Sequence, residues 1–162
     1  MDYAEELVRF LGALHQHAVE YVLIGGAAMN LHGLVRATQD IDLLIAPNAA
    51  NVARLKQALR AIWADPHIDE ISAEDLCGAY PALRYGPPEG DVFLDILTRL
   101  GEHFRYEDVE FETVAVGGTV ARVATPGMLF RMKRDTVREI DKADARALRD
   151  AFEIDDDDGR AR

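Results

Sequence analysis

The sequence of 162 residues has a single cysteine, no long apolar run and no surplus of basic charge. One cysteine, Cys77, excludes an internal disulfide and a cysteine-based zinc site. No apolar run reaches about 18 residues, and the first twenty positions carry charged residues through an amphipathic pattern, which fits neither a membrane span nor a signal peptide. We therefore expect a cytoplasmic protein that does not contact a membrane.

The balance of charge is acidic, with 29 Asp and Glu residues against 18 Lys and Arg residues and a net charge of −11. General DNA binding is therefore not expected, because it requires excess Lys and Arg to displace counterions from phosphates. Glu153 and Asp155 to Asp158 form a like-charge block of the kind that stays solvated. The length is that of one domain. We predict a single domain over residues 1–152 and an acidic disordered tail over residues 153–162.

Hydrophobic periodicity, capping residues and turn residues predict the order of helices and strands. Helices are expected over residues 3–17, 27–32, 49–63 and 125–152, the last with a break near Val137. Strands are expected over residues 20–26, 39–46, 80–86 and 91–98, followed by a hairpin over 109–125; the signals over 64–78 are weak. This order predicts an α/β or α+β fold, a mixed β-sheet with flanking helices and a C-terminal helix.

Two aspartates, Asp40 and Asp42, stand within the predicted strand QDIDLLIA. Alternate side chains of a strand point to the same face, so both carboxylates share one face while Ile41 enters the core. Two ionised carboxylates so close together repel each other, and a cation is needed to hold both charged. Mg²⁺ prefers such oxygen ligands and keeps positions for water and phosphates. A third carboxylate is available from DVFLDIL, in which Asp91 and Asp95 share a face.

A glycine pair, Gly25 and Gly26, follows the predicted strand EYVLIGG and precedes a predicted helix. Backbone N–H groups are free at such a position, and a phosphate chain can approach because no Cβ stands in the way. A phosphate cradle followed by a metal-binding aspartate pair is typical of enzymes that act on nucleoside triphosphates.

The combination of GG, D-x-D and a distant aspartate on another strand resembles the nucleotidyltransferase superfamily that includes DNA polymerase beta. YVLIGGAAMNLHGLVRATQDIDLLI closely resembles the minimal members known as AbiEii/AbiGii-type toxins, in which an arginine and a threonine, here Arg36 and Thr38, precede D-x-D. TPGMLFRMKRDTVREIDKADARAL is similar to the family's last helix, which offers a lysine, an arginine and two aspartates. The superfamily usually pairs Gly with Ser, where this chain has Gly26.

The resemblance implies a set of site residues. The metal ligands and catalytic residues would be Asp40, Asp42 and Asp95, holding Mg²⁺, or Mn²⁺ in its place. The nucleotide-binding residues would be Gly25, Gly26, Arg36, Thr38, Lys133 and Arg138. Asp141 and Asp144 are expected to hold Arg138 or Arg36 in position rather than to bind metal.

The resemblance also implies a function, with alternatives. The favoured hypothesis is a metal-dependent enzyme that moves a nucleoside monophosphate from a nucleoside triphosphate, such as ATP, to a hydroxyl on a protein or an RNA. It would belong to a toxin–antitoxin or phage-defence system, with a cognate protein partner or a tRNA-like acceptor. One alternative is a non-catalytic relative that binds a partner protein, and another is a metal-dependent phosphohydrolase.

Overall fold

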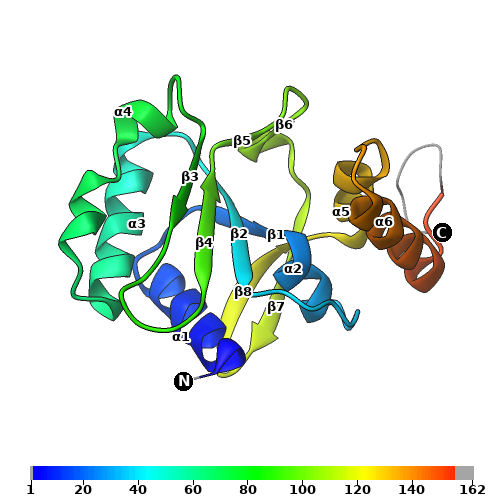
Figure 1. Cartoon of the computed structure of the whole chain (residues 1–162), viewed down its shortest axis with the longest axis horizontal. Helices are drawn as coiled ribbons and strands as arrows, with labels where there is room; N and C mark the ends of the chain where they lie inside the picture. The colour runs from blue at the N-terminus through cyan, green and yellow to red at the C-terminus, as the bar shows by residue number, and fades with distance from the viewer. Residues whose placement is uncertain (1, 156–162) are drawn as a thin grey trace.

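The computed structural model describes residues 2–155 and is a mixed α/β fold (Figure 1). The helices are α1 (Tyr3–Gln16), α2 (Gly25–Leu31), α3 (Ala49–Ile62), α4 (Ala73–Leu76), α5 (Pro126–Arg134) and α6 (Glu139–Phe152), with 3-10 helices at Pro66–Glu70 and Tyr106–Asp108. The strands are β1 (Tyr21–Ile24), β2 (Asp40–Ile45), β3 (Ala82–Tyr85), β4 (Phe93–Leu97), β5 (Arg99–Leu100), β6 (Phe104–Arg105), β7 (Phe111–Val116) and β8 (Thr119–Ala124).

The main sheet has six strands in the order β3-β4-β2-β1-β8-β7, and β5 and β6 form a separate two-stranded hairpin. Strand β2 runs parallel to β4 and antiparallel to β1, and β3 runs antiparallel to β4. The register places Asp42 directly opposite Asp95, and it places Asp95 opposite Arg84 on the edge strand. Three neighbouring strands therefore bring their polar side chains to one place.

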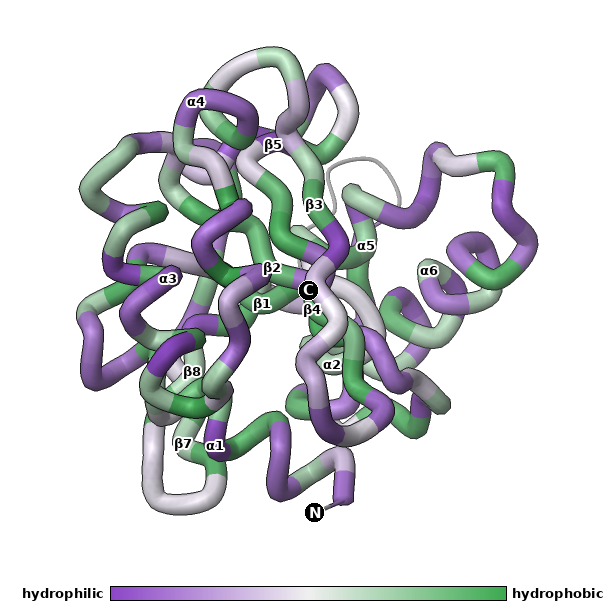
Figure 2. Tube along the Cα trace, turned by 60° about the vertical axis from the view of Figure 1, so that its left-hand side comes forward, coloured by the Kyte–Doolittle hydropathy of each residue, from purple (hydrophilic) through white to green (hydrophobic). Residues whose placement is uncertain are grey.

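Helices cover both sides of this sheet (Figure 1), with α1 and α3 packed together on one side and α2, α5 and α6 on the other. Asp2 and Glu5 form a capping box at the start of α1, and Asn48 caps α3 through the backbone N–H of Asn51. The central strands carry the hydrophobic colour in Figure 2, whereas α6 shows both colours along its turns. This pattern is that of an amphipathic surface helix.

The core is built from the apolar residues of these strands and helices. Leu23 of β1, together with Ile41 and Leu43 of β2, is fully buried, so the alternation predicted for QDIDLLIA is confirmed. Asp40 and Asp42 on the opposite face are only partly buried. Within residues 2–155 we find no helix of the length and apolar character that crossing a membrane requires.

The predicted mixed sheet with flanking helices is confirmed, and most elements lie where the sequence places them. Helix α2 begins at Gly25, the first residue of the glycine pair, and the C-terminal helix is two helices, separated around the expected break at Val137. The hairpin of β5 and β6 was not predicted. Of the predicted acidic tail, residues 156–162 lie outside the described part of the chain, and Ile154 is buried.

Candidate active site

Three carboxylates gather where β2 and β4 lie side by side. Asp42 and Asp95 are register partners, and Asp40 lies two residues before Asp42 on the same face. Burial above all, together with a hydrogen bond to Asp95 and the negative charges of Asp95 and Asp40, raises the pKa of Asp42 to about 7, against an opposing effect of Lys133. Asp42 therefore holds a proton at neutral pH far more readily than an ordinary aspartate does.

A cation already lies among these carboxylates, and it is the guanidinium of Arg84 from β3. Its Nε donates to Asp95 Oδ1 at 2.9 Å, and its Nη2 donates to Asp95 Oδ2 at 3.0 Å and to Asp40 Oδ2 at 3.2 Å. Despite the three acidic residues, no group of three or more His, Cys, Asp or Glu side chains within residues 2–155 has the arrangement of a metal site. Arg84 bonds both oxygen atoms of Asp95 and one oxygen atom of Asp40.

The glycine pair lies at the start of α2, directly beside the carboxylates. Gly25 has φ +69, and a Cβ at this position would stand 2.1 Å from Asp42 Oδ2. A Cβ at Gly26 would stand 3.1 Å from the Cβ of Thr38. Thr38 thus fills the space that a side chain at position 26 would take. Helix α2 has no side-chain cap, so its first N–H groups are not occupied by a capping side chain.

Thr38 and Tyr3 fix the backbone that carries Asp40. The Thr38 hydroxyl accepts from the backbone N–H of Asp40 at 3.2 Å and lies 3.2 Å from the Asp40 carbonyl oxygen. The Tyr3 hydroxyl donates to that same carbonyl oxygen at 3.3 Å. Burial, together with the charges of Asp42 and Asp40, raises the pKa of Tyr3 to about 12. Tyr3 therefore stays a neutral hydrogen-bond donor throughout the physiological pH range.

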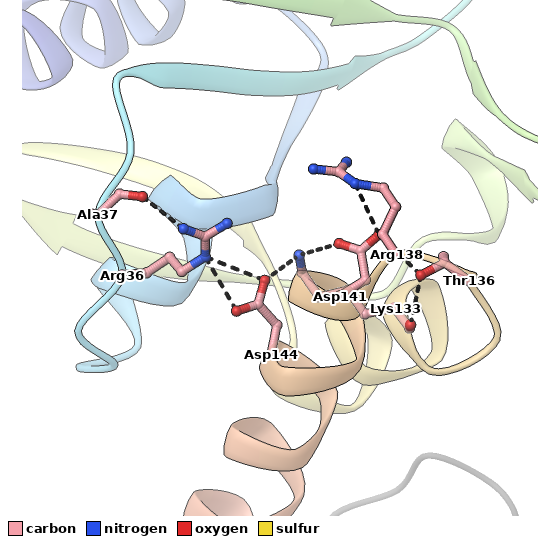
Figure 3. A network of polar contacts seen from close by, with 7 residues as sticks. All are labelled: Arg36, Ala37, Lys133, Thr136, Arg138, Asp141 and Asp144. Carbon is pink, nitrogen blue, oxygen red and sulfur yellow. Dashed lines mark hydrogen bonds and ion pairs between the residues drawn. The ribbon is translucent and has the colours of Figure 1, made fainter.

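A second network, shown in Figure 3, joins the loop before β2 to the C-terminal helices. Lys133 Nζ donates to Asp144 Oδ2 at 2.9 Å and to Asp141 Oδ1 at 3.4 Å. Arg36 Nε contacts Asp144 Oδ1 at 3.2 Å, and Arg36 Nη1 donates to the Ala37 carbonyl oxygen at 2.7 Å. The Asp144 side chain is only 7% exposed, so two cations share one buried carboxylate.

Arg138 is held more loosely than the other members of this network. Its Nε lies 3.9 Å from Asp141 Oδ2, and its side chain is largely exposed. Asp141 is also fixed by the Thr136 hydroxyl, which donates to Oδ2 at 2.9 Å. Asp141 and Asp144 thus contact Arg138 and Arg36, as the sequence suggested. Arg138 is free to turn, and Lys133 is not.

Asp42, Asp95 and part of the C-terminal network open on one cavity of about 1010 Å³. It lies between the edge of the sheet, the β5–β6 hairpin and helix α5. Of the predicted site residues, those that line it are Gly25, Asp42, Asp95, Lys133 and Arg138. Those that do not line it are Gly26, Arg36, Thr38 and Asp40. The structure therefore divides the predicted set into residues that line the cavity and residues that do not.

Sequence reasoning missed Arg84 and the apolar residues of the β5–β6 hairpin, Leu100 and Phe104, which also line the cavity. A signal for Arg84 was present, since the turn GPPEG joins its strand to that of Asp95 as a hairpin. The five residues of this turn do not fix the register, so the direct pairing of Arg84 with Asp95 was not predictable.

This fold, with a glycine turn beside carboxylates on two parallel strands, defines the class of nucleotidyltransferases. The comparison with known families bears this out. Residues 9–133 match the family described as nucleotidyl transferase AbiEii toxin, type IV toxin–antitoxin system, and the chain belongs to this family. No curated protein matches the sequence.

Several solved structures share the fold. The lincosamide antibiotic adenylyltransferase LnuA, in its lincomycin-bound form, superposes with a TM-score of 0.61 at 17% identity, over 90% of this chain and 95% of that one. ANT(2″)-Ia in complex with adenylyl-2″-tobramycin gives a TM-score of 0.56 at 13% identity, over 91% and 88%. JHP933 from Helicobacter pylori gives 0.56 at 20% identity, over 93% and 66%. At these identities the similarity shows the fold alone.

Proposed function

We propose that the protein is a metal-dependent nucleotidyltransferase that moves a nucleoside monophosphate from a nucleoside triphosphate to a hydroxyl on a protein or an RNA. The observation that carries this proposal is the meeting of Asp42, Asp95, Gly25 and Lys133 at one cavity. A module that only binds a partner has no need for carboxylates that raise each other's pKa. The fold is found in an enzyme that transfers a nucleotide, since LnuA is a lincosamide antibiotic adenylyltransferase.

The donor atoms fit a divalent cation. Asp40, Asp42 and Asp95 offer hard carboxylate oxygens from two adjacent strands, and Mg²⁺ or Mn²⁺ takes such ligands together with phosphate oxygens. The raised pKa of Asp42, to which the charges of Asp95 and Asp40 contribute, supports a cation at this group, because it reflects uncompensated negative charge. When bound, the cation neutralises the triphosphate and lowers the pKa of the attacking hydroxyl.

The remaining residues bind and orient the nucleotide. The backbone N–H groups of Gly25 and Gly26 donate to phosphate oxygens, which approach closely because neither residue has a Cβ. Lys133, held in place by Asp144, offsets negative charge on the leaving pyrophosphate. Arg138 turns from Asp141 towards the phosphates. We assign Arg36 and Thr38 to the same nucleotide site as supports, through Asp144 and through the backbone of Asp40.

We place this activity in the cytoplasm, within a toxin–antitoxin or phage-defence pair that includes a cognate protein partner. The alternative is a non-catalytic relative that binds a partner protein. One observation favours that alternative: within residues 2–155 no group of three or more His, Cys, Asp or Glu side chains is arranged to hold a metal ion. The two functions differ in whether a nucleotide becomes attached to another molecule.

A labelling experiment tests the proposal. The protein is incubated with cellular RNA and protein extract and with each of the four nucleoside triphosphates, labelled with ³²P at either the α- or the γ-phosphate. We expect the α-label of one nucleotide to appear on RNA or protein with Mg²⁺ and to disappear with EDTA. The γ-label should not transfer, which separates nucleotidyl transfer from phosphoryl transfer. Release of γ-phosphate without any α-labelled product would support a phosphohydrolase instead, and the absence of both would support the partner-binding alternative.

A further inference from the structure

The contacts of Arg84 are unusual for a side chain on an edge strand. Its guanidinium forms a two-pronged pair with Asp95 and extends to Asp40 with the same Nη2 atom. It also lies over the ring of Phe93, with Cζ 5.3 Å from the ring centroid. The side chain is nevertheless 55% exposed, so it is anchored by its charged end rather than by packing.

Through these contacts the guanidinium is the counter-ion of Asp95 and Asp40. Asp95 and Asp40 lie on the two sides of the group that would coordinate a divalent cation, and Arg84 joins them. A bidentate arginine uses both oxygen atoms of a carboxylate, so the same lone pairs are not available to a metal. Lys133, the other cation near this group, is already paired with Asp141 and Asp144.

The cavity offers the guanidinium of Arg84 a second position. Arg84 lines the cavity together with Asp42 and Asp95, and it is the positively charged member of these three. Rotation about its side-chain bonds turns the guanidinium from the carboxylates to the cavity without moving the strand, because more than half of the side chain is in solvent. In that position the guanidinium would contact a ligand bound beside the glycine turn and the carboxylates.

We propose that Arg84 is an exchangeable counter-ion of the active site: it releases Asp95 and Asp40 when a divalent cation binds, and it then pairs with the phosphates of the nucleotide. This inference rests on the proposed function, because it requires a metal–triphosphate site. Arg84 would oppose the binding of a metal ion alone and favour the binding of a metal with its nucleotide. The site would then fill preferentially with both ligands together, and a metal ion alone would bind more weakly.

The test compares wild type with Arg84→Gln at pH 8. Binding of Mn²⁺ alone is followed by the electron paramagnetic resonance signal of the free ion. Binding of the Mn²⁺ complexes of the four α,β-methylene nucleoside triphosphates is measured by calorimetry. For Arg84→Gln we expect Mn²⁺ alone to bind about threefold to tenfold more tightly, in line with the loss of an exposed competing ion pair. We expect the preferred metal–nucleotide complex to bind about fivefold or more weakly.

Arg60→Gln is the matched control. Arg60 lies on α3 and forms another exposed ion pair, with Asp69, and neither residue lines the cavity. This variant should leave both affinities unchanged. If Arg84→Gln weakens Mn²⁺ binding, or leaves both affinities at the wild-type values while wild type binds metal and nucleotide, the inference is overturned and the proposed function stands. If wild type binds neither probe, the proposed function itself fails and the inference fails with it.

Discussion

Asp42→Asn is expected to abolish nucleotidyl transfer and at the same time to stabilise the folded protein at pH 8 in metal-free buffer. Asparagine keeps the shape of the side chain but removes the charge that a divalent cation needs. We expect transfer to fall by about a thousandfold or more, because a metal ligand and a catalytic charge are lost together. Loss of transfer together with a gain in stability identifies a functional residue, because substitution of a structural residue would lower stability.

The sign of the stability effect follows from the pKa of Asp42. The folded protein raises this pKa from 3.8 to about 7, so folding favours the protonated carboxyl. The stability that this proton brings is fully present below about pH 4 and is lost as pH rises through about 7. Asparagine cannot ionise, so the variant does not lose it. After a discount for the partial exposure of Asp42, we expect a gain of about 1–2 kcal/mol at pH 8, or about 3–6 °C in Tm.

Melting curves at pH 8 and pH 4.5 in EDTA measure this effect, with Asp91→Asn as the matched control. Asp91 is an exposed aspartate that precedes the same strand as Asp95 and does not line the cavity. Its substitution should leave both the Tm and transfer unchanged. The gain of Asp42→Asn should shrink towards zero at pH 4.5. If Asp42→Asn transfers nucleotide at the wild-type rate, or if its Tm at pH 8 is lower than that of wild type, the assignment of Asp42 as a metal ligand is contradicted.

Gly25→Ala is expected to disrupt the site by geometry rather than by charge. The added Cβ would stand 2.1 Å from Asp42 Oδ2, and the backbone has φ +69, a conformation that costs an alanine about 1–2 kcal/mol. Either Asp42 or the start of α2 must shift, and the proposed function needs both, one for the metal and the other for the phosphates. We expect a loss of about 2–3 kcal/mol of stability, about 5–10 °C in Tm, and a loss of transfer of about a hundredfold or more.

Gly118→Ala separates the two causes of this effect. Gly118 has φ +81 in the turn between β7 and β8, with open space where a Cβ would stand. It should show the backbone cost alone, with a lower Tm but wild-type transfer. If Gly25→Ala also transfers nucleotide at the wild-type rate, the close contact between Gly25 and Asp42 has no role in the reaction.

The sequence was sufficient for the fold because its strongest patterns are local. The alternation around Ile41, the caps at Asn48 and Thr125 and the glycines of the β7–β8 turn each determine one element from a few neighbouring residues. Asp95 was preferred to Asp91 from the family resemblance and because a glycine and a turn precede Asp91, and the register of β2 and β4 places Asp95 opposite Asp42. The position of Asp91 before β4 leaves it exposed.

Contacts between distant parts of the chain could not be predicted in this way. The pairing of Arg84 with Asp95 depends on the register of an edge strand, and the pairing of Lys133 with Asp144 depends on the angle between α5 and α6. No pattern within either segment determines these two quantities. The β5–β6 hairpin has two residues in each strand, too few for a periodic signal, although it closes one side of the cavity.

The most direct measurement of the central claim, a metal–triphosphate site at the carboxylates, is the thermal stability of wild type and of the double variant Asp40→Asn/Asp42→Asn. Each is melted with ATP, GTP, CTP or UTP, with and without Mg²⁺. A nucleotide at about 100 times its dissociation constant adds about 2.7 kcal/mol of stability. We predict that at least one nucleotide stabilises wild type only with Mg²⁺ and that the double variant loses this response. No response of wild type to any nucleotide, or an equal response of the double variant, would contradict the account.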